Sequence, residues 1–131
     1  MKIIAADHTN WWVRDVERSL GFYRDVLGLE PFGLEAYERG EHPLVSLRVT
    51  PEFILHLRPD PTFEPASTGG YDHLALVVED TSLEEMAEHL TNAGVEIENR
   101  SENVIGARGP GQALYVRDPD GYLIELKFYG T

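Results

Sequence analysis

Residues 112–128 read QALYVRDPDGYLIELKF, a stretch that predicts two β-strands joined by a tight turn. Pro119 favours the φ angle of the second position of a type I turn, and Gly121 accepts the left-handed conformation that closes a three-residue hairpin loop. A loop of that length pairs Asp118 with Tyr122 across the two strands. The turn chemistry therefore fixes the register of the hairpin.

That register places Tyr115 opposite Glu125 on one face of the hairpin. Strand alternation sends Ile124, Leu126 and Phe128 to the other face. A phenol and a carboxylate thus share the less apolar side of a predicted sheet. For a single carboxylate on a single strand, a solvated polar face is the simplest explanation, and a functional site is the alternative.

The length, composition and net charge of the chain exclude several classes of function. With 131 residues, one compact domain with a hydrophobic core is expected. The absence of Cys excludes disulfides, thiolate nucleophiles and Cys-ligated metal sites. A net charge of −12 argues against nucleic acid or an anionic membrane as a partner. The apolar runs are too short to span a membrane or to form the core of a signal peptide, so a cytoplasmic location is expected.

An internal repeat relates the two halves of the chain. Each half starts with a histidine on a predicted strand, His8 in the first and His73 in the second. A valine follows five residues later, an aspartate seven residues later, and a glycine twenty or twenty-one residues later. Each half therefore runs from a strand into a capped helix that ends at glycine.

Hydrophobic periodicity divides each half into similar elements. The predicted elements are strands at 3–13, 30–38, 44–49, 53–57, 72–79 and 95–98, and helices at 16–27 and 83–93. Residues 99–111 are loop-rich and stay unassigned. The prediction is one α+β domain over residues 1–131 that contains two βαβββ modules. Module 1 covers about residues 1–58, a Pro/Gly-rich linker about 58–70, and module 2 about 71–131.

A helix covers one face of each predicted sheet, so the bare faces can curve into a shared trough. Strand parity predicts the polar side chains of that trough: His8, His56, His73, Tyr115 and Glu125. Two imidazoles and a carboxylate on one side of a divalent cation leave positions open for substrate. Each histidine alone is more often structural, which is how we interpret His42 and His89.

The chain resembles the vicinal oxygen chelate superfamily, which includes glyoxalase I, extradiol dioxygenases, fosfomycin-resistance enzymes, methylmalonyl-CoA epimerases and bleomycin-binding proteins. The matching stretches span nearly the whole chain in the right order: HTNWWVRD (8–15), SLGFYRDVLGL (19–29), ILHL (54–57), DHLALVVED (72–80) and YVRDPDGYLIEL (115–126). The resemblance implies paired βαβββ modules that form a U-shaped, partly open barrel-like sheet with helices on the outside.

The resemblance also implies roles for the trough residues. The family's metal ligands match His8, His73 and Glu125 of this sequence. Glyoxalase-type members carry Glu or Gln at the position of His56, whereas ring-cleaving dioxygenases carry an acid/base histidine there. Those dioxygenases also have a tyrosine ten residues before the ligand glutamate, which Tyr115 matches. His56 is therefore expected to be catalytic together with Tyr115, with a fourth metal ligand as the alternative role of His56.

The expected function is a metal-dependent enzyme that acts on a small substrate with vicinal oxygens, with extradiol cleavage of a catechol favoured. Fe(II) is the expected cofactor, and Mn, Ni, Co or Zn are alternatives. The alternative functions are a glyoxalase I-like lyase or epimerase, a metal-free drug- or metabolite-binding protein, and a fosfomycin-resistance protein. The last would need a basic cluster, for which Arg108 and Arg117 are the candidates. The resemblance favours a homodimer, with neither nucleic acid nor membrane as a partner.

Overall fold

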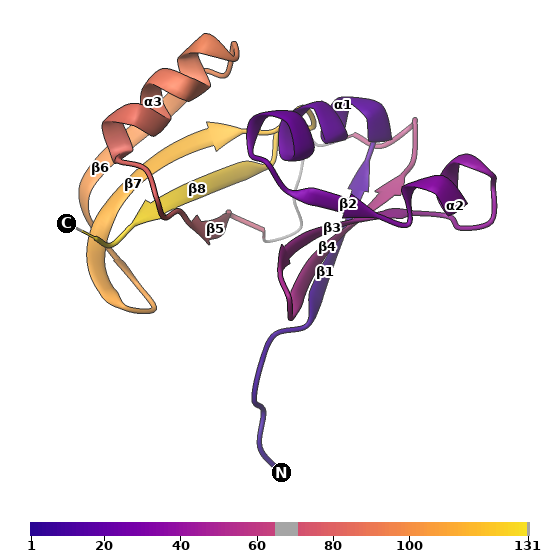
Figure 1. The fold of residues 1–131 in the computed structure, drawn as a ribbon, viewed down its shortest axis with the longest axis horizontal. Helices are drawn as coiled ribbons and strands as arrows, with labels where there is room; N and C mark the ends of the chain where they lie inside the picture. The colour runs from indigo at the N-terminus through magenta and orange to yellow at the C-terminus, as the bar shows by residue number, and fades with distance from the viewer. Residues whose placement is uncertain (65–70, 131) are drawn as a thin grey trace. The chain divides into compact units, whose positions relative to one another are not determined.

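The computed structural model describes residues 1–64 and 71–130 and divides into two compact units, unit 1 up to Glu64 and unit 2 from residue 65. Figure 1 shows one β-sheet and at least one helix in each unit. None of the helices in these described ranges is long and apolar enough to cross a membrane. The predicted linker at 58–70 lies partly outside the described residues.

Unit 1 contains an open four-stranded sheet in the order β1-β4-β3-β2. β1 runs parallel to β4, and the other pairs are antiparallel. Its elements in chain order are β1 (His8–Val13), α1 (Val16–Leu20), the π-helical turn η1 (Gly21–Val26), β2 (Glu30–Phe32), α2 (Leu34–Glu38), β3 (Val45–Thr50) and β4 (Phe53–Pro59).

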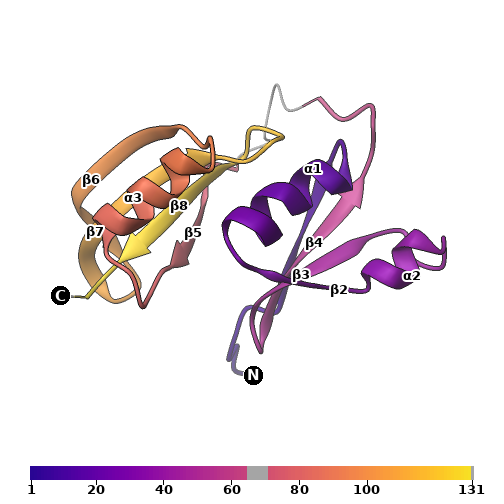
Figure 2. The same ribbon diagram turned by 45° about the horizontal axis from the view of Figure 1, so that its top comes forward.

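The helix of unit 1 starts and ends where its residues predict. The Asp15 carboxylate accepts a hydrogen bond from the Glu17 backbone N–H at 2.9 Å, which caps α1. Gly28 ends the helical segment with a φ of 76°, a left-handed conformation that glycine adopts without strain. The helix lies along the sheet in Figure 2. The fully buried core side chains of this unit are Val13, Leu20, Tyr23, Val45, Leu47, Leu55 and Leu57.

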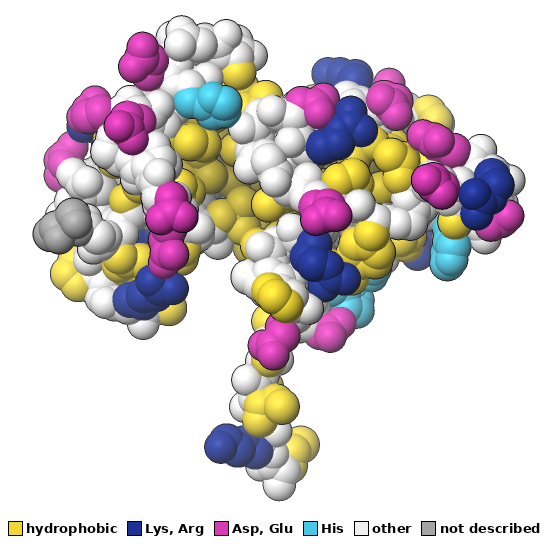
Figure 3. Space-filling view, viewed as in Figure 1, with side chains coloured by type: hydrophobic (Ala, Val, Ile, Leu, Met, Phe, Trp, Pro, Cys, Tyr) yellow, Lys and Arg dark blue, Asp and Glu magenta, His cyan; other side chains and the backbone are white. Residues whose placement is uncertain are grey.

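Unit 2 repeats the strand order of unit 1, as β5-β8-β7-β6, with β5 parallel to β8. Its elements are β5 (Leu74–Val77), α3 (Leu83–Asn92), β6 (Ile97–Gly106), β7 (Gly109–Arg117) and β8 (Leu123–Phe128). The capping box that Ser82 and Glu85 form starts α3. Acidic side chains lie along the outer surface of this helix in Figure 3. The α+β class and the two βαβββ modules are therefore confirmed.

The hairpin between β7 and β8 has the predicted register. The Asp118 backbone N–H donates to the Tyr122 carbonyl at 2.9 Å, and Gly121 has a φ of 91°. The buried Asp118 carboxylate also accepts from the backbone N–H groups of Asp120 and Tyr122, each at 2.9 Å. As a result, Tyr115 stands opposite Glu125.

Several predicted elements differ from the structure. The strand predicted at 30–38 is wrong beyond Phe32, because Gly33 turns the chain at a φ of 74° into the short helix α2. The unassigned residues 99–111 form most of the long β6–β7 hairpin, whose ladder has register shifts at 97–99 and 101–104. The first strand of each sheet begins later than predicted, β1 at His8 instead of residue 3 and β5 at Leu74 instead of residue 72.

Candidate functional site

The polar face of the unit 2 sheet brings three predicted residues together. The His73 Nε2 atom lies 3.1 Å from Glu125 Oε1, and the Tyr115 hydroxyl donates to the same oxygen at 3.0 Å. Glu125 sits on β8 with its side chain 7% exposed, whereas His73 precedes β5 and is 32% exposed. Burial, and the hydrogen bond with Glu125, raise the pKa of Tyr115. The phenol therefore stays a hydrogen-bond donor to the carboxylate.

A buried lysine, which the sequence analysis missed, lies beside the other carboxylate oxygen. Lys127 is 2% exposed, and its Nζ lies 3.7 Å from Glu125 Oε2. The ammonium group also donates to the Val104 carbonyl on β6. Its side chain crosses β7 at Gly111, where an added Cβ would lie 3.3 Å from Lys127 Cε and 2.7 Å from a backbone oxygen. The signal was available, since Lys127 follows Glu125 by two residues and so shares its face.

The corresponding face of unit 1 holds the other two predicted histidines. The rings of His8 and His56 have centroids 4.7 Å apart, and both stand on neighbouring parallel strands. The Ser46 hydroxyl lies 2.8 Å from His56 Nδ1 and fixes the orientation of that ring. Partial burial lowers the pKa of His56, and the charge of the nearby Arg58 lowers it further. His56 is therefore neutral near pH 7.

An aspartate precedes each of the two histidines that begin the repeat. Asp7 Oδ2 lies 2.7 Å from His8 Nδ1, and Asp72 Oδ2 lies 2.6 Å from His73 Nδ1. An ionised carboxylate only accepts, so each Nδ1 carries the hydrogen and each Nε2 is directed away from the aspartate. This arrangement is common behind metal-binding histidines. The Asp-His dipeptide that occurs at the start of both halves of the sequence was the available signal for this arrangement.

The donor set in unit 2 suits a divalent cation. An imidazole nitrogen and a carboxylate oxygen point at one another, and both are ligands that Fe, Mn, Ni, Co and Zn accept. Within residues 1–64 and 71–130, however, no group of three or more His, Cys, Asp or Glu side chains is close enough to hold a metal. The structure brings His73 to Glu125 and His8 to His56, one pair in each unit.

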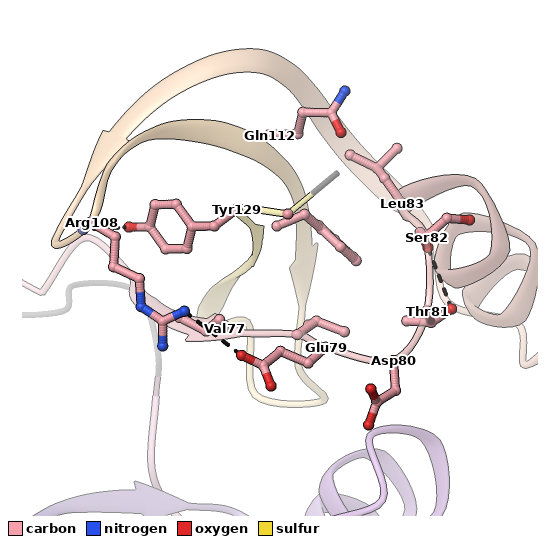
Figure 4. Close-up of a pocket in the computed structure, with 12 residues that line it drawn as sticks. Val77, Glu79, Asp80, Thr81, Ser82, Leu83, Arg108, Gln112 and Tyr129 are labelled. Carbon is pink, nitrogen blue, oxygen red and sulfur yellow. Dashed lines mark hydrogen bonds and ion pairs between the residues drawn. The ribbon is translucent and has the colours of Figure 1, made fainter.

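A separate cavity of about 630 Å³ lies in unit 2, away from these residues. It is lined by the segment from Val77 to Leu83, by the C-terminal end of the chain around Tyr129, and by Arg108 and Gln112 (Figure 4). Arg108 lies 3.7 Å from Glu79 across this cavity. Its lining includes none of the five predicted site residues.

Comparison with known proteins gives a consistent assignment. The model of the family described as "Glyoxalase/Bleomycin resistance protein/Dioxygenase superfamily" matches residues 5–126. Virulence protein STM3117 of Salmonella typhimurium is 29% identical over 98% of this chain and 87% of its own length. A probable lactoylglutathione lyase of Synechocystis sp. is 29% identical over 91% of each chain.

A solved structure, the integron cassette protein VCH_CASS1 of V. cholerae, has a TM-score of 0.77 to this chain, at 30% identity. The similarity covers 99% of this chain and 98% of that one. The sequence match over residues 5–126 and the paired βαβββ arrangement agree with one another. The chain belongs to the glyoxalase/bleomycin resistance protein/dioxygenase superfamily.

Proposed function

We propose that this protein is a divalent-metal-dependent enzyme that acts on a small substrate with two adjacent oxygens, and that it cleaves a catechol ring in the extradiol position. The observation that carries the proposal is the convergence of His73 Nε2 and the Tyr115 hydroxyl on Oε1 of the buried Glu125. A carboxylate held in this way is prepared for a cation, because its orientation is set before the ligand arrives.

In this proposal His8, His73 and Glu125 hold the cation. A bound divalent metal lowers the pKa of a substrate hydroxyl and stabilises negative charge that develops on its oxygens. Asp7 and Asp72 keep the two imidazoles in the tautomer that leaves Nε2 available. Tyr115 holds the Glu125 carboxylate in place through its hydroxyl hydrogen bond.

His56 is the proton acceptor of the proposed reaction. Because its pKa is lowered, the imidazole is neutral at pH 7 and can take a proton from a substrate hydroxyl. The proposed tautomer of His56 donates its Nδ1–H to the Ser46 oxygen, which leaves Nε2 as the accepting atom. Both oxygen atoms of O2 enter the ring-opened product, so the reaction needs no external reductant.

Oxygen uptake by anaerobically Fe(II)-loaded protein, measured across a panel of catechols, tests the reaction. We expect one molecule of O2 consumed for each catechol opened. His56→Gln should retain Fe(II) and lose at least about 100-fold in turnover, the usual contribution of a general base. If His56→Gln instead loses the metal, His56 is a ligand. If none of the catechols consumes oxygen, extradiol cleavage is wrong.

The second candidate is a lyase or isomerase of the lactoylglutathione type, which the name of the Synechocystis relative suggests. The same His56 would then carry a proton between two adjacent carbons of a hemithioacetal, and O2 would not be consumed. Turnover of the hemithioacetal of methylglyoxal and glutathione, without catechol oxidation, would select this candidate.

The remaining alternatives have less support. The two arginines predicted for a phosphonate site are each beside a carboxylate, since Arg108 lies 3.7 Å from Glu79 and Arg117 pairs with Glu98 at 2.6 Å. A metal-free binding protein has no need for imidazole and carboxylate groups that converge. Protein purified without added metal and examined by elemental analysis separates this last alternative from the enzymes, since stoichiometric metal contradicts it.

A further inference from the structure

The polar face of the unit 1 sheet carries an arginine and a tryptophan beside the proposed base. Arg58 follows His56 by two residues on β4, so both side chains leave the sheet on the same face. Arg58 stands in register with Trp12 on β1, and its guanidinium carbon lies 5.8 Å from the centroid of the Trp12 ring. The Trp12 side chain is 49% exposed although it is large and apolar.

Arg58 differs from most arginines of this acidic chain. Five others pair with a carboxylate: Arg24 with Asp25, Arg39 with Glu41, Arg100 with Glu84, Arg108 with Glu79 and Arg117 with Glu98. Across residues 1–64 and 71–130, Arg58 has no carboxylate within ion-pair distance, and its recorded contact is the indole ring. In a chain of net charge −12, such an arginine is unusual, since acidic residues outnumber basic ones by 23 to 11.

We propose that Arg58 and Trp12 form a binding site for a carboxylate carried by the planar ring of the substrate. A guanidinium offers two parallel N–H donors that match a carboxylate, and it loses less hydration than an ammonium group would. The indole face supplies a flat apolar surface for the ring. The inference deepens the proposed function, since it names the substrate class of the same site.

The spacing along β4 defines where that carboxylate stands on the substrate. Residues two apart on a strand are separated by about 7 Å, so the anion site is about one ring diameter from His56. A ring whose adjacent hydroxyls meet His56 therefore places its carboxylate on the opposite side. The expected class is an aromatic acid with two vicinal hydroxyls, of which 3,4-dihydroxybenzoate is the simplest probe.

Calorimetric titration of anaerobic, Mn²⁺-loaded protein tests this inference with two probes that differ in charge. We expect 3,4-dihydroxybenzoate to bind at least about tenfold more tightly than the neutral 3,4-dihydroxybenzamide, the usual strength of a charge-assisted hydrogen bond. Arg58→Gln should abolish this preference and leave the affinity for the amide unchanged.

Arg48→Gln is the matched control. Arg48 lies on the same face of the sheet, over the Phe32 ring at 4.7 Å, but it donates to the Pro51 carbonyl and faces Glu30 across the strands. Its replacement removes the same charge and should keep the preference for the acid. Equal losses in the two variants would overturn the proposed site, because they would show only a general effect of charge.

Titration of the metal-free protein with benzoate separates this inference from the proposed function. Weak binding that Arg58→Gln removes would support the anion site even if the protein neither held metal nor opened a catechol. A preference for the acid that survives in Arg58→Gln would overturn it. Failure of the wild-type protein to bind either carboxylate would overturn it as well.

Discussion

The two sheets have the same strand order, but their polar faces carry different side chains. In unit 2 the buried Glu125 lies beside the His73 imidazole, the Tyr115 hydroxyl and the Lys127 ammonium group. In unit 1 the face carries His8, His56 and Arg58 around an exposed tryptophan, and its histidines contact one another. One face is built around a single buried carboxylate, whereas the other carries two imidazoles and a guanidinium beside an exposed indole.

In the proposed function, the two repeated modules have different roles. A carboxylate whose two oxygen atoms both have neighbouring polar groups is held in one orientation. It is suited to bind a cation, because it reorganises little when the cation arrives. A face with a neutral imidazole and a guanidinium that has no carboxylate partner among residues 1–64 and 71–130 is suited to a substrate that carries acidic hydroxyls and a negative charge.

Replacement of Glu125 by Gln should reduce the affinity for Mn²⁺ or Fe²⁺ by at least about 100-fold, because the cation loses an anionic ligand. Isothermal titration of the metal-free protein measures the change. Arg58→Gln, in unit 1, serves as the control and should leave the metal affinity unaltered. Full metal occupancy in Glu125→Gln would contradict the ligand role and leave the two faces without the proposed distinction.

Replacement of Lys127 by Met should destabilise the protein by about 3 kcal/mol, because it leaves the Glu125 carboxylate buried without its counterion. The double variant Glu125→Gln/Lys127→Met should recover much of this loss, since neither charge then remains buried. Urea denaturation of the two single variants and the double variant measures the coupling. Additive losses would show that the 3.7 Å pair contributes nothing specific.

The sequence predicted the strand register behind this difference better than it predicted the contacts between charged groups. Pro119 and Gly121 have turn preferences that act within four residues, so the register of Tyr115 and Glu125 followed from local chemistry alone. Strand parity likewise placed His56 opposite the buried Leu55 and Leu57. Local rules of this kind are strong wherever one face of a strand is buried.

The same reasoning failed where the outcome depends on distant residues. Lys127 received no predicted role although parity puts it on the Glu125 face, because its burial and its bond to a carbonyl of β6 depend on a strand that stayed unassigned. Gly33 ended a strand that hydrophobic alternation alone would have continued. The Asp-His dipeptides were visible in the sequence, but their meaning depended on which imidazole nitrogen faces the aspartate.

Replacement of Asp72 by Asn should weaken metal binding by about tenfold, because His73 loses the carboxylate that fixes its tautomer. Asp7→Asn should have an effect of the same size if His8 is also a ligand. Titrations of both variants with Co²⁺, followed through its visible absorption, compare the two modules directly. An effect in Asp72→Asn alone would restrict the metal site to unit 2 and exclude His8 from it.

The smallest expected effects come from the two hydroxyls that hold site groups, one in each unit. Tyr115→Phe removes a single hydrogen bond to Glu125 and should weaken metal binding by about fivefold, which corresponds to roughly 1 kcal/mol. Ser46→Ala should leave metal binding unchanged, because Ser46 contacts only the proposed base. In that variant the ¹⁵N shifts of His56 should report a mixture of tautomers, and catechol turnover should fall. If Ser46→Ala weakened metal binding as much as Tyr115→Phe does, His56 would be a metal ligand. The proposed difference in role between the two sheet faces would then be wrong.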